Sequence, residues 1–124
     1  MRENDILSIR PNLDLPVVED TTFVEQFQNQ TLRPILKLQH EIIIEYFNYH
    51  IKQRKLPFET LSKAKKSSFI IQTIQKDLLL KNQLLGIIIG HFTLPELHFY
   101  HAHESELSRR LRDLLTQRIT SVFE

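Results

Sequence analysis

Apolar side chains recur along this chain every three or four residues, which is the spacing of one face of an α-helix. Over residues 32–54 one broad face is apolar and the opposite face is charged. The last stretch repeats this pattern with Leu107, Leu111, Leu114, Leu115, Ile119 and Val122. The spacing predicts an all-α fold: a helical bundle of about four main helices, with short additional helices near residues 23–30 and 58–66.

The stretch over residues 68–89 is apolar almost all round, which is typical of the central helix of a bundle. Ser67 or Ser68 can cap its start, and Gly90 suits the left-handed position that often follows a helix. Gly86 lies inside this helix, where a glycine costs about 1 kcal/mol relative to alanine. We expect the close approach of another helix to explain it.

Two threonines mark helix starts. Thr93 and Glu96 have the spacing of a capping box, and a proline stands between them in the first turn. Thr22 and Glu25 repeat the spacing ahead of a short helix that begins at Phe23. A bend near residues 101–104 is expected before the final helix.

Prolines interrupt the first third of the chain. Pro11 and Pro16 predict an extended or weakly helical lead-in over residues 1–21 of a single domain, 1–124. Pro34 leaves two alternatives. Thr31 can cap a new helix with the proline in its first turn, or one long helix from residue 23 can be kinked at the proline. We prefer the break.

Composition excludes several classes of function. A chain of 124 residues is one domain's worth, and its 41% hydrophobic and 25% charged residues are ordinary for a globular protein. Without cysteine it has no disulfides, thiolate zinc sites or thiol nucleophiles. Two glycines are far fewer than the usual ~7%, which argues against sheets and glycine-rich phosphate loops.

Charge and hydropathy point to a cytoplasmic protein with neither a membrane nor a nucleic acid as partner. Basic and acidic residues number 16 and 15, and the first residues are charged rather than signal-like. The longest apolar run, residues 84–89, is far shorter than the ~20 residues of a membrane span. Six basic residues against one acidic residue over 52–66 are interpreted as a solvated helix end, with contact to nucleic acid as the weaker alternative.

Four polar residues fall on apolar helix faces and are the candidates for a ligand pocket. They are Gln39, His50, Asp77 and Lys81. Asp77 and Lys81 stand one turn apart and can pair, as a buried charge requires. Two readings stay open. The residues form an internal ion pair and hydrogen bonds that fix helix register, or they line a pocket that binds a ligand or performs acid–base chemistry.

Histidines gather before the final helix. His98, His101, His103 and Glu104 are the candidate metal ligands, because imidazole and carboxylate bind zinc and similar ions. The spacing matches no His-Glu-x-x-His motif and no di-iron bundle motif. Histidines at the surface or at an interface are the preferred interpretation, and we predict no cofactor.

Four stretches together resemble a family of small helical bacterial proteins, found mainly in the Bacteroidetes group, of unknown function. They are Ile9-Arg10-Pro11, FQNQTLRPILKLQ over 27–39, Gln75-Lys76-Asp77, and GIIIGHFT over 86–93. The resemblance spans most of the chain and implies a bacterial cytoplasmic protein.

Members of that family sometimes carry an automatic "glyoxalase" label, which we do not adopt. One glyoxalase type places metal ligands on strands, and this chain has no strand pattern. The other needs a His-x-His-x-Asp-His motif, whereas His101-Ala102-His103 is followed by Glu104-Ser105. We therefore expect a non-enzymatic interaction protein that forms a homo-oligomer. The alternative is a helical bundle that binds a small ligand or metal, which could include an enzyme.

Overall fold

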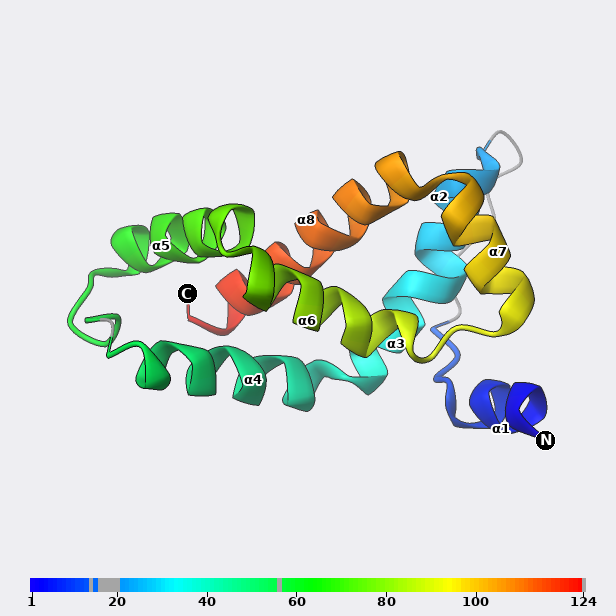
Figure 1. The fold of residues 1–124 in the computed structure, drawn as a ribbon, viewed down its shortest axis with the longest axis horizontal. Coiled ribbons are helices and arrows are strands. Elements are labelled where there is room, and N and C mark those ends of the chain that lie inside the picture. Colours follow the sequence, from blue (N-terminus) through cyan, green and yellow to red (C-terminus); the bar gives the residue numbers. More distant parts are fainter. Residues whose placement is uncertain (14, 16–20, 56, 124) are drawn as a thin grey trace.

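The computed structural model describes residues 1–13, 15, 21–55 and 57–123. Helices are the only regular elements in these ranges (Figure 1). They are α1 (Arg2–Ile9), α2 (Phe23–Phe27), the π-helix η1 (Gln28–Leu32), α3 (Arg33–Leu38), α4 (His40–Gln53), α5 (Lys63–Lys76), α6 (Leu78–Ile89), α7 (Leu94–Ala102) and α8 (Glu104–Val122). The all-α prediction is confirmed, although the expected four main helices correspond only roughly to this set.

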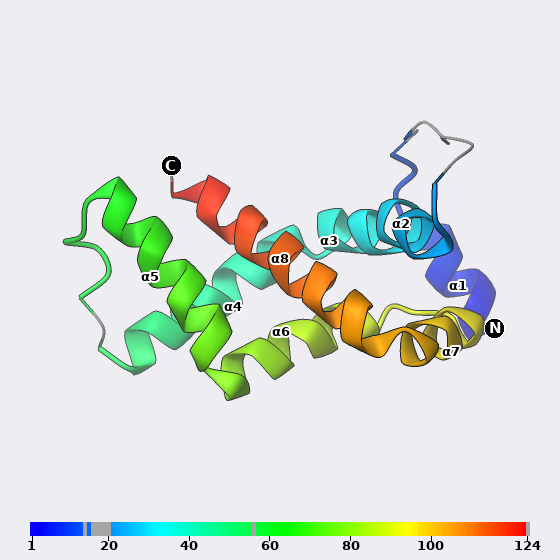
Figure 2. The ribbon, with the colours of Figure 1, turned by 90° about the horizontal axis from the view of Figure 1, so that it is seen from above.

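Helix α6 lies at the centre of the bundle and contacts α4, α5 and α8. The short elements α1, α2, η1 and α7 gather at one end of the molecule, and the loop from α4 to α5 lies at the other (Figures 1 and 2). The core is built from inward-facing rows of these helices, which include Ile43, Phe47, Ile70, Ile74, Leu80, Leu84, Ile88, Leu107, Leu111 and Ile119. None of the described helices is long and apolar enough to cross a membrane.

The caps expected at Thr22 and Thr93 are confirmed. The Thr22 hydroxyl accepts a hydrogen bond from the Glu25 N–H at 3.1 Å. Thr93 and Glu96 make both bonds of a capping box. The expected bend is also present, because α7 ends at Ala102 and α8 begins two residues later.

Pro34 does not begin a separate helix, so our preferred break there is wrong. Helices α2, η1 and α3 follow one another without interruption. The Arg33 N–H reaches back five residues to the Gln28 carbonyl, and this wide turn comes just before a proline that has no N–H to donate. Thr31 does not cap a helix; its hydroxyl donates to Glu96 at 3.2 Å.

The short helix predicted over residues 58–66 is also absent. Residues 57–62 are not helical, and residues 63–66 belong to α5, which begins at Lys63 after the cap residue Ser62 and not at Ser67 or Ser68. Phe58 explains the difference, because its buried ring packs against Phe47, Phe69 and Phe123. An anchored aromatic side chain in this loop competes with local helix propensity.

The lead-in is helical where the structure describes its first part, since α1 covers Arg2–Ile9. Positions 14 and 16–20, including Pro16, lie outside the described residues. Gly90, expected in a left-handed conformation, is right-handed with φ −60° and ψ −16°. Among the described residues the left-handed one is Lys55, two positions after α4 ends, with φ 52°.

Gly86 does not face another helix, contrary to expectation. A Cβ atom built at this position meets nothing within 4 Å, and the residue is exposed in the middle of α6. Its φ is not positive, so an L-residue fits without strain.

We therefore expect Gly86→Ala to raise the free energy of unfolding by about 0.5–1 kcal/mol, because alanine has the higher helix propensity. Urea denaturation measures the change. Gln83→Ala, at an exposed position of the same helix, is the matched control and should change stability by a few tenths of a kcal/mol at most. A loss of stability in Gly86→Ala would contradict this account.

Candidate functional site

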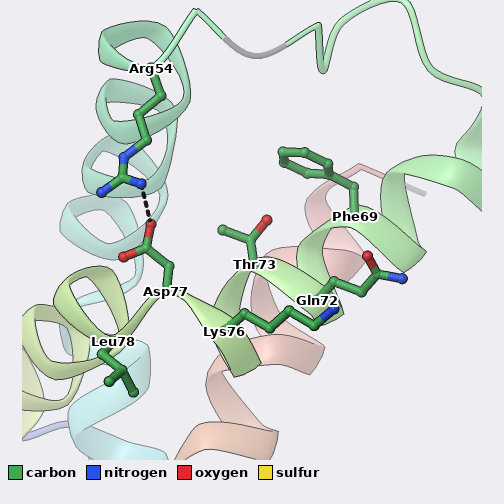
Figure 3. A pocket seen from close by; sticks show the side chains of 7 residues that line it. All are labelled: Arg54, Phe69, Gln72, Thr73, Lys76, Asp77 and Leu78. Atoms are coloured by element: carbon green, nitrogen blue, oxygen red, sulfur yellow. Dashed lines mark ion pairs between the residues drawn. The ribbon is translucent and has the colours of Figure 1, made fainter.

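Three side chains from two helices meet where α5 ends and α6 begins, at a junction that we call the elbow. His50 Nε2 lies 2.8 Å from Asp77 Oδ2, and Arg54 Nη1 lies 3.1 Å from the same oxygen. His50 and Arg54 stand one turn apart at the end of α4, so both point toward Asp77. Figure 3 shows the ion pair between Arg54 and Asp77.

The helix expected over residues 68–89 is broken at Asp77, which corrects the sequence interpretation. Asp77 has an extended backbone with ψ 93°, and its Oδ1 accepts a hydrogen bond from the Leu80 N–H at 3.1 Å. The residue is therefore the N-cap of α6, a position that aspartate favours. The pair expected with Lys81 is not among the ion pairs of the described residues, because His50 and Arg54 occupy the carboxylate instead.

The carboxylate of Asp77 stays ionised at neutral pH. Burial alone would raise its pKa, but the hydrogen bond from Leu80 and the charges of His50 and Arg54 together lower it. One oxygen serves the helix cap and the other serves the side chains of α4. The arrangement thus matches the first of the two readings from the sequence, an internal polar contact that fixes the helices.

A surface depression of about 560 Å³ lies beside the elbow. Phe69 and Thr73 project from α5 on one side, and Arg54 and Asp77 lie on the other (Figure 3). Apolar and charged groups together could contact a small polar molecule or a side chain of a partner. The second reading from the sequence, a ligand pocket, therefore keeps a structural basis.

The other two pocket candidates do not reach the elbow. Gln39 interrupts the helix expected over 32–54 and joins α3 to α4, three turns from His50 along α4. Lys81 lines a different groove of about 380 Å³, with Tyr100 and Glu104. Burial, and then the charge of Glu104, raise the pKa of the Tyr100 phenol.

The histidine cluster does not converge. His98, His101, His103 and Glu104 are exposed, and within the described ranges no three His, Asp or Glu residues are placed to hold a metal ion. The His103 ring lies 4.6 Å from the Phe99 ring. These observations favour the surface interpretation of the histidines.

The sequence did not reveal a second polar cluster, in which Arg10 binds Glu96. Arg10 Nη1 and Nη2 donate to the two carboxylate oxygens of Glu96 at 2.6 and 2.9 Å, and the side chains are only 9% and 18% exposed. Nη2 also donates to the His91 carbonyl at 2.9 Å. This fork-to-fork pair ties the segment after α1 to the start of α7.

Two threonines make the remaining hydrogen bonds to the Glu96 carboxylate. The Thr93 N–H donates to one carboxylate oxygen at 2.8 Å, and the Thr31 hydroxyl donates to the other at 3.2 Å. Burial would raise the pKa of Glu96, but the bonds from Arg10, Thr93 and Thr31 lower it. Burial, then Arg10 and Arg2, lower the pKa of His91. The sequence contains one signal of this cluster, which is Arg10 itself, a charged residue between Ile9 and Pro11.

We expect Asp77→Ala to lower the free energy of unfolding by about 1–3 kcal/mol, because α6 loses its cap and two α4 side chains lose their partner. Asp77→Asn keeps an oxygen for the cap and should lose less stability.

Because the pKa of Asp77 is lowered in the folded state, the charge-dependent stabilisation is present at neutral pH and is lost as the pH falls below the ordinary value of 3.8. Chemical denaturation at several pH values measures both effects. The control is Asp113→Asn on α8, which is exposed. An Asp77 variant as stable as this control would refute the role.

We expect Arg10→Ala to destabilise the protein by about 3 kcal/mol, since it leaves a largely buried carboxylate without its main partner. Arg10→Lys should recover only part of this loss, because an ammonium group cannot make the forked contact. Thermal and urea unfolding measure the change. Arg2→Ala removes a half-exposed arginine nearby and should cost about 0.5 kcal/mol or less. Equal effects of the two alanine variants would contradict the proposed contact.

Comparison of this chain with protein-family models, with curated proteins and with solved structures found no match. The family resemblance of the four stretches stays a prediction. What the protein does is therefore argued below from its own side chains.

Proposed function

We propose that this chain is a non-enzymatic interaction protein that self-associates through an exposed apolar stripe on α4. The supporting observation is that the apolar face of α4 is wider than the part covered by its own bundle. Ile43 and Phe47 are fully buried on this face. At its outer edge Ile42 is 52% exposed and Tyr49 is 62% exposed. A helix that only supports its own bundle needs no apolar side chains beyond the covered part.

Ile42 and Tyr49 lie seven residues apart, so they share one stripe of the helix. Leu38, just before α4, is also exposed and continues the stripe by one turn. In Figure 1, α4 runs along the edge of the bundle, and no other helix lies outside it. The stripe therefore offers the seven-residue spacing with which two helices pack.

Charge on the flank of this stripe favours a second copy of the chain as the partner. Glu41 lies near the start of α4 and Lys52 near its end, and both are exposed. In an antiparallel pair with Ile42 opposite Tyr49, Glu41 of one copy lies near Lys52 of the other. A two-fold interface is self-complementary in this way, and opposite charges on facing helices set their orientation.

The alternative function is binding of a small ligand at the elbow. It is supported by the depression of about 560 Å³ beside Asp77 and Arg54. The two proposals are separable, because Asp77→Asn would weaken the binding of such a ligand, and Asp77 is not part of the α4 stripe. We further propose the bacterial cytoplasm as the location, as the family resemblance implies.

Light scattering coupled to size-exclusion chromatography tests self-association. We expect a dimer at micromolar concentration and a monomer for Ile42→Asp or Tyr49→Asp at the same concentration. Each apolar side chain contributes about 1.5–3 kcal/mol on burial and occurs twice in the dimer, so the dissociation constant should rise roughly 100-fold or more. Leu94→Asp, at an exposed position of α7, is the control and should leave the dimer intact.

A charge-reversal series tests the orientation. Glu41→Lys alone should weaken the dimer, and Glu41→Lys combined with Lys52→Glu should restore it. A wild-type protein that is monomeric throughout the micromolar range would overturn the proposal. A dimer that survives both Ile42→Asp and Tyr49→Asp would place the interface elsewhere.

A further inference from the structure

We infer that Arg33 and Arg118 form a binding site for a small oxyanion, a phosphate or a carboxylate. The two guanidinium groups line one pocket of about 350 Å³ between α3, the start of α4, and α8. The pocket also contains the side chains of His40, Gln117 and Ser121 and an apolar floor that includes Leu114. It shares no residue with the elbow or with the outer stripe of α4.

The described partners of both arginines are not carboxylates. Arg33 Nε donates to the amide oxygen of Asn29 at 3.0 Å. Arg118 Nη1 lies 3.2 Å from His40 Nδ1. Because a guanidinium group can only donate, this nitrogen is the acceptor in the contact. None of the described residues lining the pocket is acidic.

Three other arginines of the chain pair with a carboxylate. Arg10 reaches Glu96, Arg54 reaches Asp77, and Arg110 reaches Glu106. Neither Arg33 nor Arg118 takes part in an ion pair with any described residue. Half-buried charges without counter-charges are unusual in a folded protein, because burial penalises an unpaired charge.

The two arginines also repel each other. Burial, and then the charge of Arg33, lower the pKa of Arg118, which nevertheless stays protonated at neutral pH. The fold thus places two like charges around one pocket. An anion between them would replace this repulsion by attraction.

The chemistry of the pocket selects oxygen anions. Each guanidinium group presents N–H donors in a planar fork that matches the oxygens of phosphate or carboxylate. The Ser121 hydroxyl and the Gln117 amide can donate further hydrogen bonds at the rim. The volume is at the lower end of the range for small-molecule sites, roughly 300–1,000 Å³. A small organic phosphate or carboxylate fits this description better than a large ligand.

Titration of the full chain with inorganic phosphate, and separately with malonate, tests the site and distinguishes the two oxyanions. Sodium chloride at matched ionic strength serves as the reference. Isothermal calorimetry gives the affinity, and thermal unfolding should show a rise in Tm of roughly 5–10 °C at about a hundredfold excess over Kd.

Arg33→Gln and Arg118→Gln should each weaken binding by about 10- to 100-fold, since each removes charge-assisted hydrogen bonds. Arg109→Gln on the exposed side of α8 is the matched control and should bind as the wild type does. A second readout separates a binding site from a structural pair. Without anion, each pocket variant should unfold at the same or a higher temperature than the wild type, because like-charge repulsion is relieved.

The inference is overturned if neither anion stabilises the protein beyond chloride. It is equally overturned if the pocket variants keep the full stabilisation, which would show general salting effects of these anions rather than a site. Because the pocket and the α4 stripe share no residue, either proposal can fail while the other holds.

Discussion

The carboxylate of Asp77 is the contact on which the arrangement of the central helices depends. Its two oxygens have separate tasks: Oδ1 caps α6, and Oδ2 receives His50 and Arg54 from the end of α4. A single side chain thus fixes where α5 stops, where α6 starts and where α4 lies. The buried rows of α5 and α6 can face one core because the chain changes direction here.

Periodicity alone could predict the helices and their caps but not this change of direction. A break in a helix is visible in the sequence when the apolar positions change their register. A stretch that is apolar almost all round shows no such change, so the pattern over residues 68–89 predicts one helix. Aspartate suits both a paired position inside a helix and a cap before one. The contacts that Asp77 makes from the cap position reach His50 and Arg54, which are distant in the sequence. Phe58 is a similar case, because its ring is held by residues from three other parts of the chain.

The candidate site was predicted in part, for a related reason. His50 and Asp77 were singled out as polar residues on apolar faces, and the structure brings them together. Lys81 was chosen because it stands one turn after Asp77, but its place in a different groove follows from the break. Arg10 and Glu96 were missed because no local spacing connects positions so far apart. The part that Glu96 plays in the capping box also gave it a sufficient local explanation.

Pairing of charge separates structural arginines from the candidate binding pair. The Arg10 side chain is only 9% exposed, and both of its terminal nitrogens donate to the carboxylate of Glu96. Among the described residues Arg33 and Arg118 have no carboxylate partner, although acidic residues are nearly as numerous as basic ones in the whole chain. Helix α4 connects the three regions, with His40 at its start, the apolar stripe along it, and His50 at its end. The contact between His50 and Asp77 fixes the far end of α4. An anion bound near His40 would therefore leave the position of the stripe unchanged.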